Sequence, residues 1–275
     1  MEKSASLPFG RTRRLLHLGQ LAGGIASGAF GEGMRQLASG RRPRAGDLFL
    51  TPSNARRLAE KLSEMRGAAL KVGQLLSMEA GEVLPRELTD VLARLRDKAH
   101  SMPLGEVAAA LEAAWGKGWE HRFKRFSFTP LAAASIGQVH EATTRAGERL
   151  AIKVQYPGVR DSIDSDIDNV AGLLRIFRLL PPEFALDPLL AEAKQQLHAE
   201  TDYRAEARQL QQYSTLLGGT PGLVMPAVDR DLSTERVLAM TYVAGRPLEE
   251  LSAAPAGVRD DVAKRLLALT LQEVF

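Results

Sequence analysis

The amino-acid sequence predicts an α+β fold, and three features of its hydrophobic pattern support this class. Apolar residues recur every three or four positions between about residues 54 and 116, which is the spacing of amphipathic helices. From about residue 122, short runs alternate apolar and polar residues, which is the pattern of half-buried strands. Helical spacing returns over residues 159–180 and 188–216, so helices are expected on both sides of the strands in the chain.

The first helical region is expected to form a compact all-helical unit over residues 54–116. Asn54 is a suitable N-cap, and the helix that follows is expected to run through Met78. A second helix is expected to begin at Pro85, because proline fits the first helical position. A third helix is predicted to begin after Pro103 and to run to about Trp115.

Strand patterns and a terminal helix follow this unit. Three strands are predicted at about residues 123–128, 139–143 and 150–154, and two more at about 223–228 and 236–242. The last helix is predicted over residues 258–275. Its apolar side chains are expected to form an exposed patch that lowers solubility or drives oligomerisation; they are Val262, Leu266, Leu267, Leu269 and Leu271.

Composition excludes several classes of site. The chain contains no cysteine, which excludes disulfides, thiolate metal sites and cysteine nucleophiles. Its five histidines show no paired ligand spacing, so no metal site is predicted. No run of 18 or more apolar residues occurs, so the sequence predicts no membrane-spanning helix.

The first 46 residues form a basic segment, with eight Lys or Arg side chains against two Glu, in a chain of net charge +3. Such a segment favours an anionic partner, and a solvated terminus is an equally good interpretation. A membrane surface is favoured over nucleic acid, because aromatic residues make up only 5% of the chain. Residues 15–30 form a Gly-rich helix with two G-x-x-x-G spacings, which suit a homodimer contact or a membrane surface.

The strand over residues 150–154 carries a lysine that suits nucleotide chemistry. A lysine on a rigid strand neutralises phosphate charge when a nearby helix supplies a carboxylate that fixes its rotamer. Lys153 is that lysine, although an ordinary edge lysine would give the same pattern. The segment Ala132–Val139 lies just upstream, and its small side chains would let backbone N–H groups approach a phosphate. Alanine in place of glycine restricts this loop, which would hinder the geometry of phosphate transfer.

Two further segments are unusual. K-V-G-Q at 71–74 places a glycine within a helix, where it costs about 1 kcal/mol relative to alanine and suggests close contact with another element. E-T-D-Y at 200–203, with Glu206, places three carboxylates within two helical turns. Asp202 and Glu206 would then share one helix face and repel each other unless a cation intervenes. An exposed acidic helix face is the alternative interpretation.

Five segments of the chain together carry a family resemblance. They are K-V-G-Q at 71–74, A-A-A-S-I-G-Q-V-H at 132–140, A-I-K-V-Q-Y-P-G-V at 151–159, E-T-D-Y-R-A-E-A at 200–207 and V-L-A-M-T-Y-V-A-G at 237–245. In this order they resemble the UbiB/AarF family of atypical protein-kinase-like proteins, which is associated with ubiquinone (coenzyme Q) biosynthesis.

The resemblance implies a division of the chain into four parts. Residues 1–46 would be the basic segment with its Gly-rich helix, and residues 47–120 a helical extension that carries the K-x-G-Q signature. Residues 121–246 would form a kinase-like small lobe, an antiparallel sheet with an αC-like helix. Residues 247–275 would be only the start of the large lobe.

The resemblance also implies a nucleotide site. Lys153 would contact the phosphates and pair with Glu206 on the αC-like helix. The residues implied to bind adenine nucleotide are Ala132, Ala133, Ala134, Ser135, Ile136, Gly137, Gln138 and Lys153, with Met240, Tyr242 and Val243 from the hinge strand.

A second implied set of residues would regulate this site. The signature helix would fold over the nucleotide pocket and occlude the place where a protein substrate would bind. Members of the family are therefore expected to act as ATPases or small-molecule kinases. The residues that would make this contact are Lys71, Gly73 and Gln74 on the signature helix and Glu200 and Asp202 opposite it.

The chain departs from the family pattern after the hinge. The family carries its catalytic and magnesium-binding residues in His-x-Asp-Pro-His-x-Gly-Asn and Asp-Phe-Gly segments, and the 275 residues contain neither. No catalytic residue and no metal ligand is therefore predicted in this chain, and weak binding of ATP or ADP with magnesium is expected.

Two functions follow as hypotheses. The first is a portion of an atypical kinase or ATPase that binds adenine nucleotide and supports ubiquinone biosynthesis. The alternative is a non-catalytic scaffold that binds a membrane surface or ubiquinone-biosynthesis proteins. The expected location is the cytoplasm or the periphery of a bacterial inner membrane, in preference to the mitochondrion.

Overall fold

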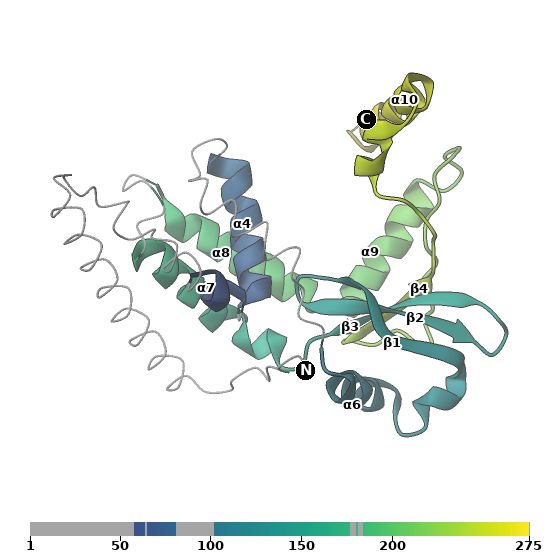
Figure 1. Cartoon of the computed structure of the whole chain (residues 1–275), viewed down its shortest axis with the longest axis horizontal. Coiled ribbons are helices and arrows are strands. Elements are labelled where there is room, and N and C mark those ends of the chain that lie inside the picture. The colour runs from purple at the N-terminus through teal and green to yellow at the C-terminus, as the bar shows by residue number, and fades with distance from the viewer. Residues whose placement is uncertain (1–57, 64, 81–101, 177–179, 181–183, 275) are drawn as a thin grey trace.

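The computed structural model describes residues 58–63, 65–80, 102–176, 180 and 184–274. Its architecture is α+β, with one four-stranded antiparallel sheet and a separate group of helices beside it (Figure 1), so the predicted class is confirmed. The basic segment, the Gly-rich helix, the proposed cap at Asn54 and the proposed helix start at Pro85 lie outside the described residues.

The sheet has the order β1-β2-β3-β4, and each neighbouring pair is antiparallel. The strands are β1 (Phe123–Ala133), β2 (Gly137–Thr144), β3 (Arg149–Gln155) and β4 (Val237–Thr241). The strand expected at 223–228 is wrong, because only Val228 forms a bridge, to Met240 of β4. A turn at residues 221–222 comes just before this segment, and residues 223–227 have no strand assignment.

Residues 58–63 are helical, and six further helices accompany the sheet in the described part of the chain. They are α4 (Arg66–Ala80), α6 (Leu104–Trp115), α7 (Val159–Ile176), α8 (Leu186–Glu200), α9 (Tyr203–Leu216) and α10 (Ala256–Val274), with short 3-10 turns at Trp119–Arg122 and Leu248–Ala253. The single helix expected over 188–216 is wrong, since the chain breaks between α8 and α9. Thr201 closes α8 by donating its hydroxyl to the His198 carbonyl, and Asp202 caps α9 by accepting from the Ala205 N–H.

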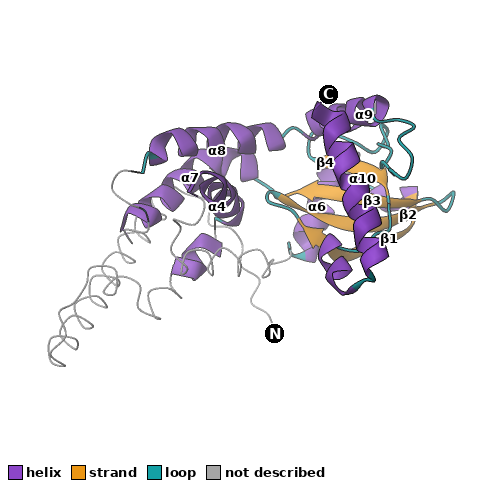
Figure 2. Ribbon diagram, turned by 90° about the horizontal axis from the view of Figure 1, so that it is seen from above, coloured by secondary structure: helices purple, strands orange, loops and turns teal. Residues whose placement is uncertain are grey.

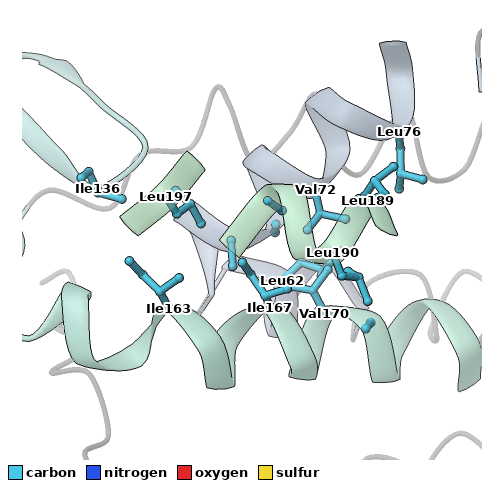
Figure 3. Close-up of a cluster of buried hydrophobic side chains, with 14 of the residues drawn as sticks. Leu62, Val72, Leu76, Ile136, Ile163, Ile167, Val170, Leu189, Leu190 and Leu197 are labelled. Atoms are coloured by element: carbon cyan, nitrogen blue, oxygen red, sulfur yellow. The ribbon is translucent and has the colours of Figure 1, made fainter. Parts of the chain in front are cut away.

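The buried side chains form two separate hydrophobic cores. The first joins α4, α7 and α8, and its buried side chains interdigitate in Figure 3; they include Leu62, Val72, Leu76, Ile163, Ile167, Val170, Leu189, Leu190 and Leu197. The second lies between α6 and one face of the sheet, where Val107 and Leu111 are fully buried. Both ribbon views place α4, α7 and α8 to one side of the sheet (Figures 1 and 2). The expected compact unit over 54–116 is therefore wrong, because α4 and α6 belong to different cores.

The two faces of the sheet have different neighbours. Leu150, Ile152 and Val154 of β3 are buried in the second core. Because side chains alternate along a strand, Ala151 and Lys153 project from the opposite face, the face that α9 covers. The alternation of β3 thus places one polar position, Lys153, where the sheet meets α9.

Helix α10 packs little against the rest of the described chain and lies beyond α9, away from the sheet (Figure 1). None of its residues is buried, and Leu266, Leu267 and Leu271 are exposed. The predicted exposed apolar patch is confirmed for these three residues, whereas Val262 and Leu269 are half-buried. Within the described residues, no helix is both long and apolar enough to cross a bilayer.

Candidate functional site

An ion pair between Lys153 and Glu206 lies at the centre of the site. The Lys153 Nζ donates to both carboxylate oxygens of Glu206, at 2.7 and 2.8 Å. β3 supplies the lysine and the first turn of α9 supplies the glutamate, so two rigid elements fix the pair. The side chains are 17% and 36% exposed, which leaves the ammonium within reach of a ligand. The predicted pairing of these two residues is present.

The ring of Tyr203 lies beneath the Lys153 ammonium of this ion pair. Tyr203 is the first residue of α9, its side chain is fully buried, and the Lys153 Nζ lies 4.7 Å from the centre of its ring. Burial raises the pKa of the Tyr203 hydroxyl, and the carboxylates of Glu206 and Glu200 raise it further. The hydroxyl oxygen has no hydrogen-bond partner. The phenol is therefore neutral at physiological pH, and its ring is an apolar, electron-rich surface beneath the ammonium.

The Ala-rich segment forms the turn between β1 and β2. Ala132 and Ala133 end β1, and the Ala134 N–H donates to the Gly137 carbonyl at 2.8 Å to close the turn. Ile136 points out of this turn into the first core and is buried there (Figure 3). The Ala side chains remain exposed or half-buried, so the backbone of the turn stays close to its surface.

Gly137 is required by its surroundings. A Cβ at this position would lie 2.4 Å from the Val154 carbonyl oxygen and 2.8 Å from the Tyr203 hydroxyl. The turn therefore rests directly on β3 and on the tyrosine that underlies Lys153. Gly67 makes a comparable approach from α4, where a Cβ would lie 2.6 Å from the Ser135 carbonyl oxygen.

Glu200 connects the turn to the helix that carries the K-x-G-Q segment. One of its oxygens accepts from the Lys71 Nζ at 2.7 Å, and the other accepts from the Ser135 hydroxyl at 2.8 Å. Both contacts are partly buried, so the carboxylate holds α4 and the turn together with charge-assisted hydrogen bonds that are partly shielded from water. The predicted contact between Lys71 and Glu200 is present.

The other residues of the K-V-G-Q and E-T-D-Y segments that were expected in this contact do not take part in it. Gln74 is exposed on α4, and Gly73 is buried between α4 and its neighbours. Asp202 is the cap of α9 and lies 3.7 Å from Arg208, so its carboxylate neither meets Lys71 nor faces Glu206 across a helix turn. The repulsion expected between Asp202 and Glu206 is thereby avoided, because the helix begins between them.

Gln138 lies on the opposite face of the sheet from Lys153. Its side chain is buried, its Oε1 accepts from the Met102 N–H, and its Nε2 lies 2.9 Å from the His140 Nε2. The His140 Nδ1 donates to the Ser127 carbonyl at 2.9 Å, which leaves Nε2 as the acceptor from Gln138. Burial lowers the pKa of His140. Any contact of Gln138 with a ligand at Lys153 would therefore be made by its backbone.

The expected hinge lies along the same sheet face as Lys153. Met240 is half-buried and pairs directly with Ala151, two residues from Lys153 along β3. The Tyr242 N–H donates to the Arg149 carbonyl, and the Arg149 guanidinium lies 4.1 Å from the Tyr242 ring centre. Val243 follows β4 and is exposed. The Tyr242 N–H is therefore already engaged, and a base near Met240 would have to meet the Tyr242 carbonyl or the backbone of Val243.

This arrangement suits an anion at Lys153 and a flat apolar group near Met240. An ammonium has three N–H donors, and Glu206 accepts from two, so one donor is left for a phosphate oxygen. In the described part of the chain, no group of three or more His, Asp or Glu side chains could hold a metal ion by itself; a magnesium ion bound through nucleotide phosphates needs fewer protein ligands.

Sequence reasoning missed three structural roles. It gave Tyr203 no role of its own within the E-T-D-Y segment. It assigned Ser135 to nucleotide binding but did not predict its hydrogen bond with Glu200. It also gave no role to Gly67, whose close approach to Ser135 depends on how α4 packs. The break between Glu200 and Glu206 was the signal available, because Thr-Asp is a good end and cap pair.

Comparisons with known proteins cover most of the chain. Residues 94–275 match a family model described as the ABC1 atypical kinase-like domain. The protein named "Atypical kinase COQ8, mitochondrial" from Saccharomyces cerevisiae is 39% identical over 99% of this chain and 54% of its own length. A relative from Caenorhabditis elegans, named "Atypical kinase coq-8, mitochondrial", is 37% identical, and the match covers 37% of its length. A relative from Danio rerio, named "Atypical kinase COQ8B, mitochondrial", is 36% identical, and the match covers 44% of its length. The chain thus spans about half the length, or less, of these relatives.

A solved structure of Rv3197 with erythromycin, from Mycobacterium tuberculosis, is 30% identical and aligns with a TM-score of 0.47 over 76% of this chain and 53% of that one.

The names of the relatives correct the expected location. The sequence favours a bacterial cytoplasm or inner membrane over the mitochondrion. Relatives from yeast, nematode, zebrafish and rat are all named as mitochondrial proteins, so that preference is wrong.

Proposed function

Because this chain belongs to the ABC1 atypical kinase-like family, we propose that it binds an adenine nucleotide on the Lys153 face of its sheet and supports ubiquinone biosynthesis. The observation that carries the proposal is the Lys153–Glu206 ion pair beneath the Ala-rich turn. A lysine held in this way by a helix carboxylate is the arrangement that places positive charge at nucleotide phosphates.

The nucleotide would lie along one face of the sheet. Its phosphates would accept from the third N–H of Lys153 and from backbone N–H groups of the turn over residues 132–138. Its adenine would lie toward Ala151 and Met240, two residues farther along the strands, or about 7 Å. Backbone groups at Tyr242 and Val243 would then meet the edge of the base.

We expect binding without phosphate transfer by the 275 residues alone. No group of three or more His, Asp or Glu side chains in the described residues could hold a metal ion, and the sequence contains no Asp-Phe-Gly segment, so no group of this chain is assigned to the chemistry. For a protein of the relatives' full length, the activity, substrates and partners are proposals as well. Ubiquinone biosynthesis enters through the family resemblance and is tested by measuring ubiquinone after loss of the protein in its host.

One observation favours the alternative of a non-catalytic scaffold. Glu200 ties the turn to α4, and Ile136 anchors it in the first core, so the turn is held down on the site. A protein that uses this closed form to present its surfaces would bind a membrane or a partner without needing nucleotide. Co-sedimentation with anionic lipid vesicles in the absence of nucleotide tests this alternative.

Thermal unfolding with and without ADP tests the proposed function. ADP should raise the unfolding temperature of the wild type and should do so much less for Lys153→Ala. The matched control is Lys194→Ala, since Lys194 pairs with Asp168 in a surface ion pair of similar length, 2.6 Å, in the helical group. Equal and sizeable stabilisation of the wild type and Lys153→Ala would refute the site.

A further inference from the structure

The geometry points to Tyr203 as a positioning residue of the nucleotide site, an inference that rests on the proposed function. We propose that the face of its ring holds the Lys153 ammonium where a phosphate would bind, and that the ring does this without help from its hydroxyl. The partners of the ammonium, the rigidity of the tyrosine and the state of its hydroxyl each support this assignment.

Lys153 needs a rigid support. Its long side chain has several rotatable bonds, and a phosphate binds more tightly when the ammonium is already in place. Glu206 supplies two acceptors, but its carboxylate is 36% exposed and belongs to a flexible side chain. The ring of Tyr203 is fully buried and lies 4.7 Å from the ammonium, so it is the fixed part of the lysine's surroundings.

Tyr203 is itself fixed from three directions. It begins α9, directly after the cap at Asp202. Its backbone N–H donates to the Glu235 carbonyl at 3.3 Å, which ties it to the segment before β4. The far end of its ring lies under Gly137, where a Cβ would come within 2.8 Å of the hydroxyl oxygen. One side chain therefore underlies both the lysine and the turn that would cover the phosphates.

The Tyr203 hydroxyl makes no contribution to holding Lys153 in the structure. It is buried and has no hydrogen-bond partner, a state that disfavours folding rather than supporting it. The ring face is different, because its electrons attract a cation held above it. Removing the hydroxyl should therefore leave the lysine in place, whereas removing the ring should not.

Variants at one position separate these two parts. Calorimetric titration with ADP should give the wild-type dissociation constant for Tyr203→Phe and a value about tenfold weaker for Tyr203→Leu. Tyr213→Leu is the matched control, since Tyr213 lies ten residues farther along the same helix, about 15 Å from Tyr203, and is exposed. Clear weakening by Tyr203→Phe would overturn the ring-based assignment.

A series of fluorinated phenylalanines at position 203 distinguishes the attraction between ring and cation from simple loss of packing. Phenylalanine with one, two and three ring fluorines at position 203 keeps nearly the same shape but progressively weakens the attraction for a cation. The logarithm of the ADP dissociation constant should rise stepwise along the series. A flat series would mean that the ring only fills space, and would overturn the proposal.

A nucleotide-free readout keeps this result separate from the proposed function. Protons next to the Lys153 ammonium should show upfield ring-current shifts in the NMR spectrum of the wild type and of Tyr203→Phe, and lose them in Tyr203→Leu. Upfield shifts in a wild type that does not bind ADP would refute the proposed function and leave the contact of the ring with the ammonium in place. Unshifted protons would refute that contact, whether or not ADP binds. ADP binding of equal strength in the wild type and Tyr203→Leu would refute the positioning role alone.

Discussion

Lys71 and Glu200 are 129 residues apart in the sequence, and their side chains lie 2.7 Å apart. The same carboxylate also accepts from Ser135, so one side chain joins α4 to the Ala-rich turn. This contact, together with Ile136 in the first core, fixes the turn over the Lys153 face of the sheet. The position of the helical group is thereby coupled to the candidate nucleotide site.

Glu200→Gln should loosen this connection. The amide removes the charge that Lys71 and Ser135 both contact, and leaves a partly buried ammonium without its counterion. The free energy of unfolding should fall by about 1–2 kcal/mol, less than for a fully buried pair because the carboxylate is about one-third exposed. Amide hydrogen exchange in the turn should become faster. Glu192→Gln, on the exposed face of the same helix, is the control and should change neither quantity.

Gly137→Ala should destabilise the protein. The added methyl would lie 2.4 Å from the Val154 carbonyl oxygen, and neither the strand nor the buried Tyr203 has room to move. Chemical denaturation should show a loss of about 1–3 kcal/mol. Gly172→Ala is the control, because nothing lies within 4 Å of its Cβ and it is inside α7; that change should stabilise the helix by up to about 1 kcal/mol. A neutral effect at Gly137 would mean that the turn does not rest on β3.

Stability should fall when the pH drops below about 6.5, and His140 should account for part of the loss. Burial lowers the folded-state pKa of His140 below its ordinary value of 6.5. The unfolded chain therefore binds a proton more readily, so the stability is present above pH 6.5 and is lost as the pH falls toward the folded-state pKa. Protonation would also remove the acceptor that Gln138 uses. The free energy of unfolding of His140→Gln, measured from pH 7 to pH 5, should vary less steeply than that of the wild type. Parallel curves would exclude this role for His140.

The exposed apolar side chains of α10 should drive self-association. Leu267 and Leu271 are one helical turn apart and are 61% and 50% exposed. Replacing both by Gln should lower the apparent mass at high concentration, as measured by sedimentation, with little change in stability. Ala268→Gln on the same helix adds polarity without removing a large apolar group, and should have no effect. A monomeric wild type at all concentrations would contradict this expectation.

The sequence predicted local features well because short segments determine them. The spacing of apolar residues located α6, α7 and the first three strands, and the family to which the five segments pointed is confirmed. The contacts between Lys153 and Glu206 and between Lys71 and Glu200 were predicted from the resemblance rather than from periodicity.

What the sequence could not predict depends on packing between distant segments. Helical spacing runs on through residues 188–216 and does not indicate the break at Thr201-Asp202, which forms because these two side chains close one helix and cap the next. The assignment of α4 and α6 to different cores depends on which apolar faces meet. The support of Lys153 by Tyr203 depends on the start of α9 crossing under β3.

Hydrogen exchange of the wild type with saturating ADP tests the central claim most directly. If the nucleotide lies on the Lys153 face, peptides that cover residues 132–138 and 237–243 should exchange more slowly with ADP than without it, and Lys153→Ala should abolish the difference. ADP binding that leaves both segments unchanged, or that protects them equally in Lys153→Ala, would contradict the account.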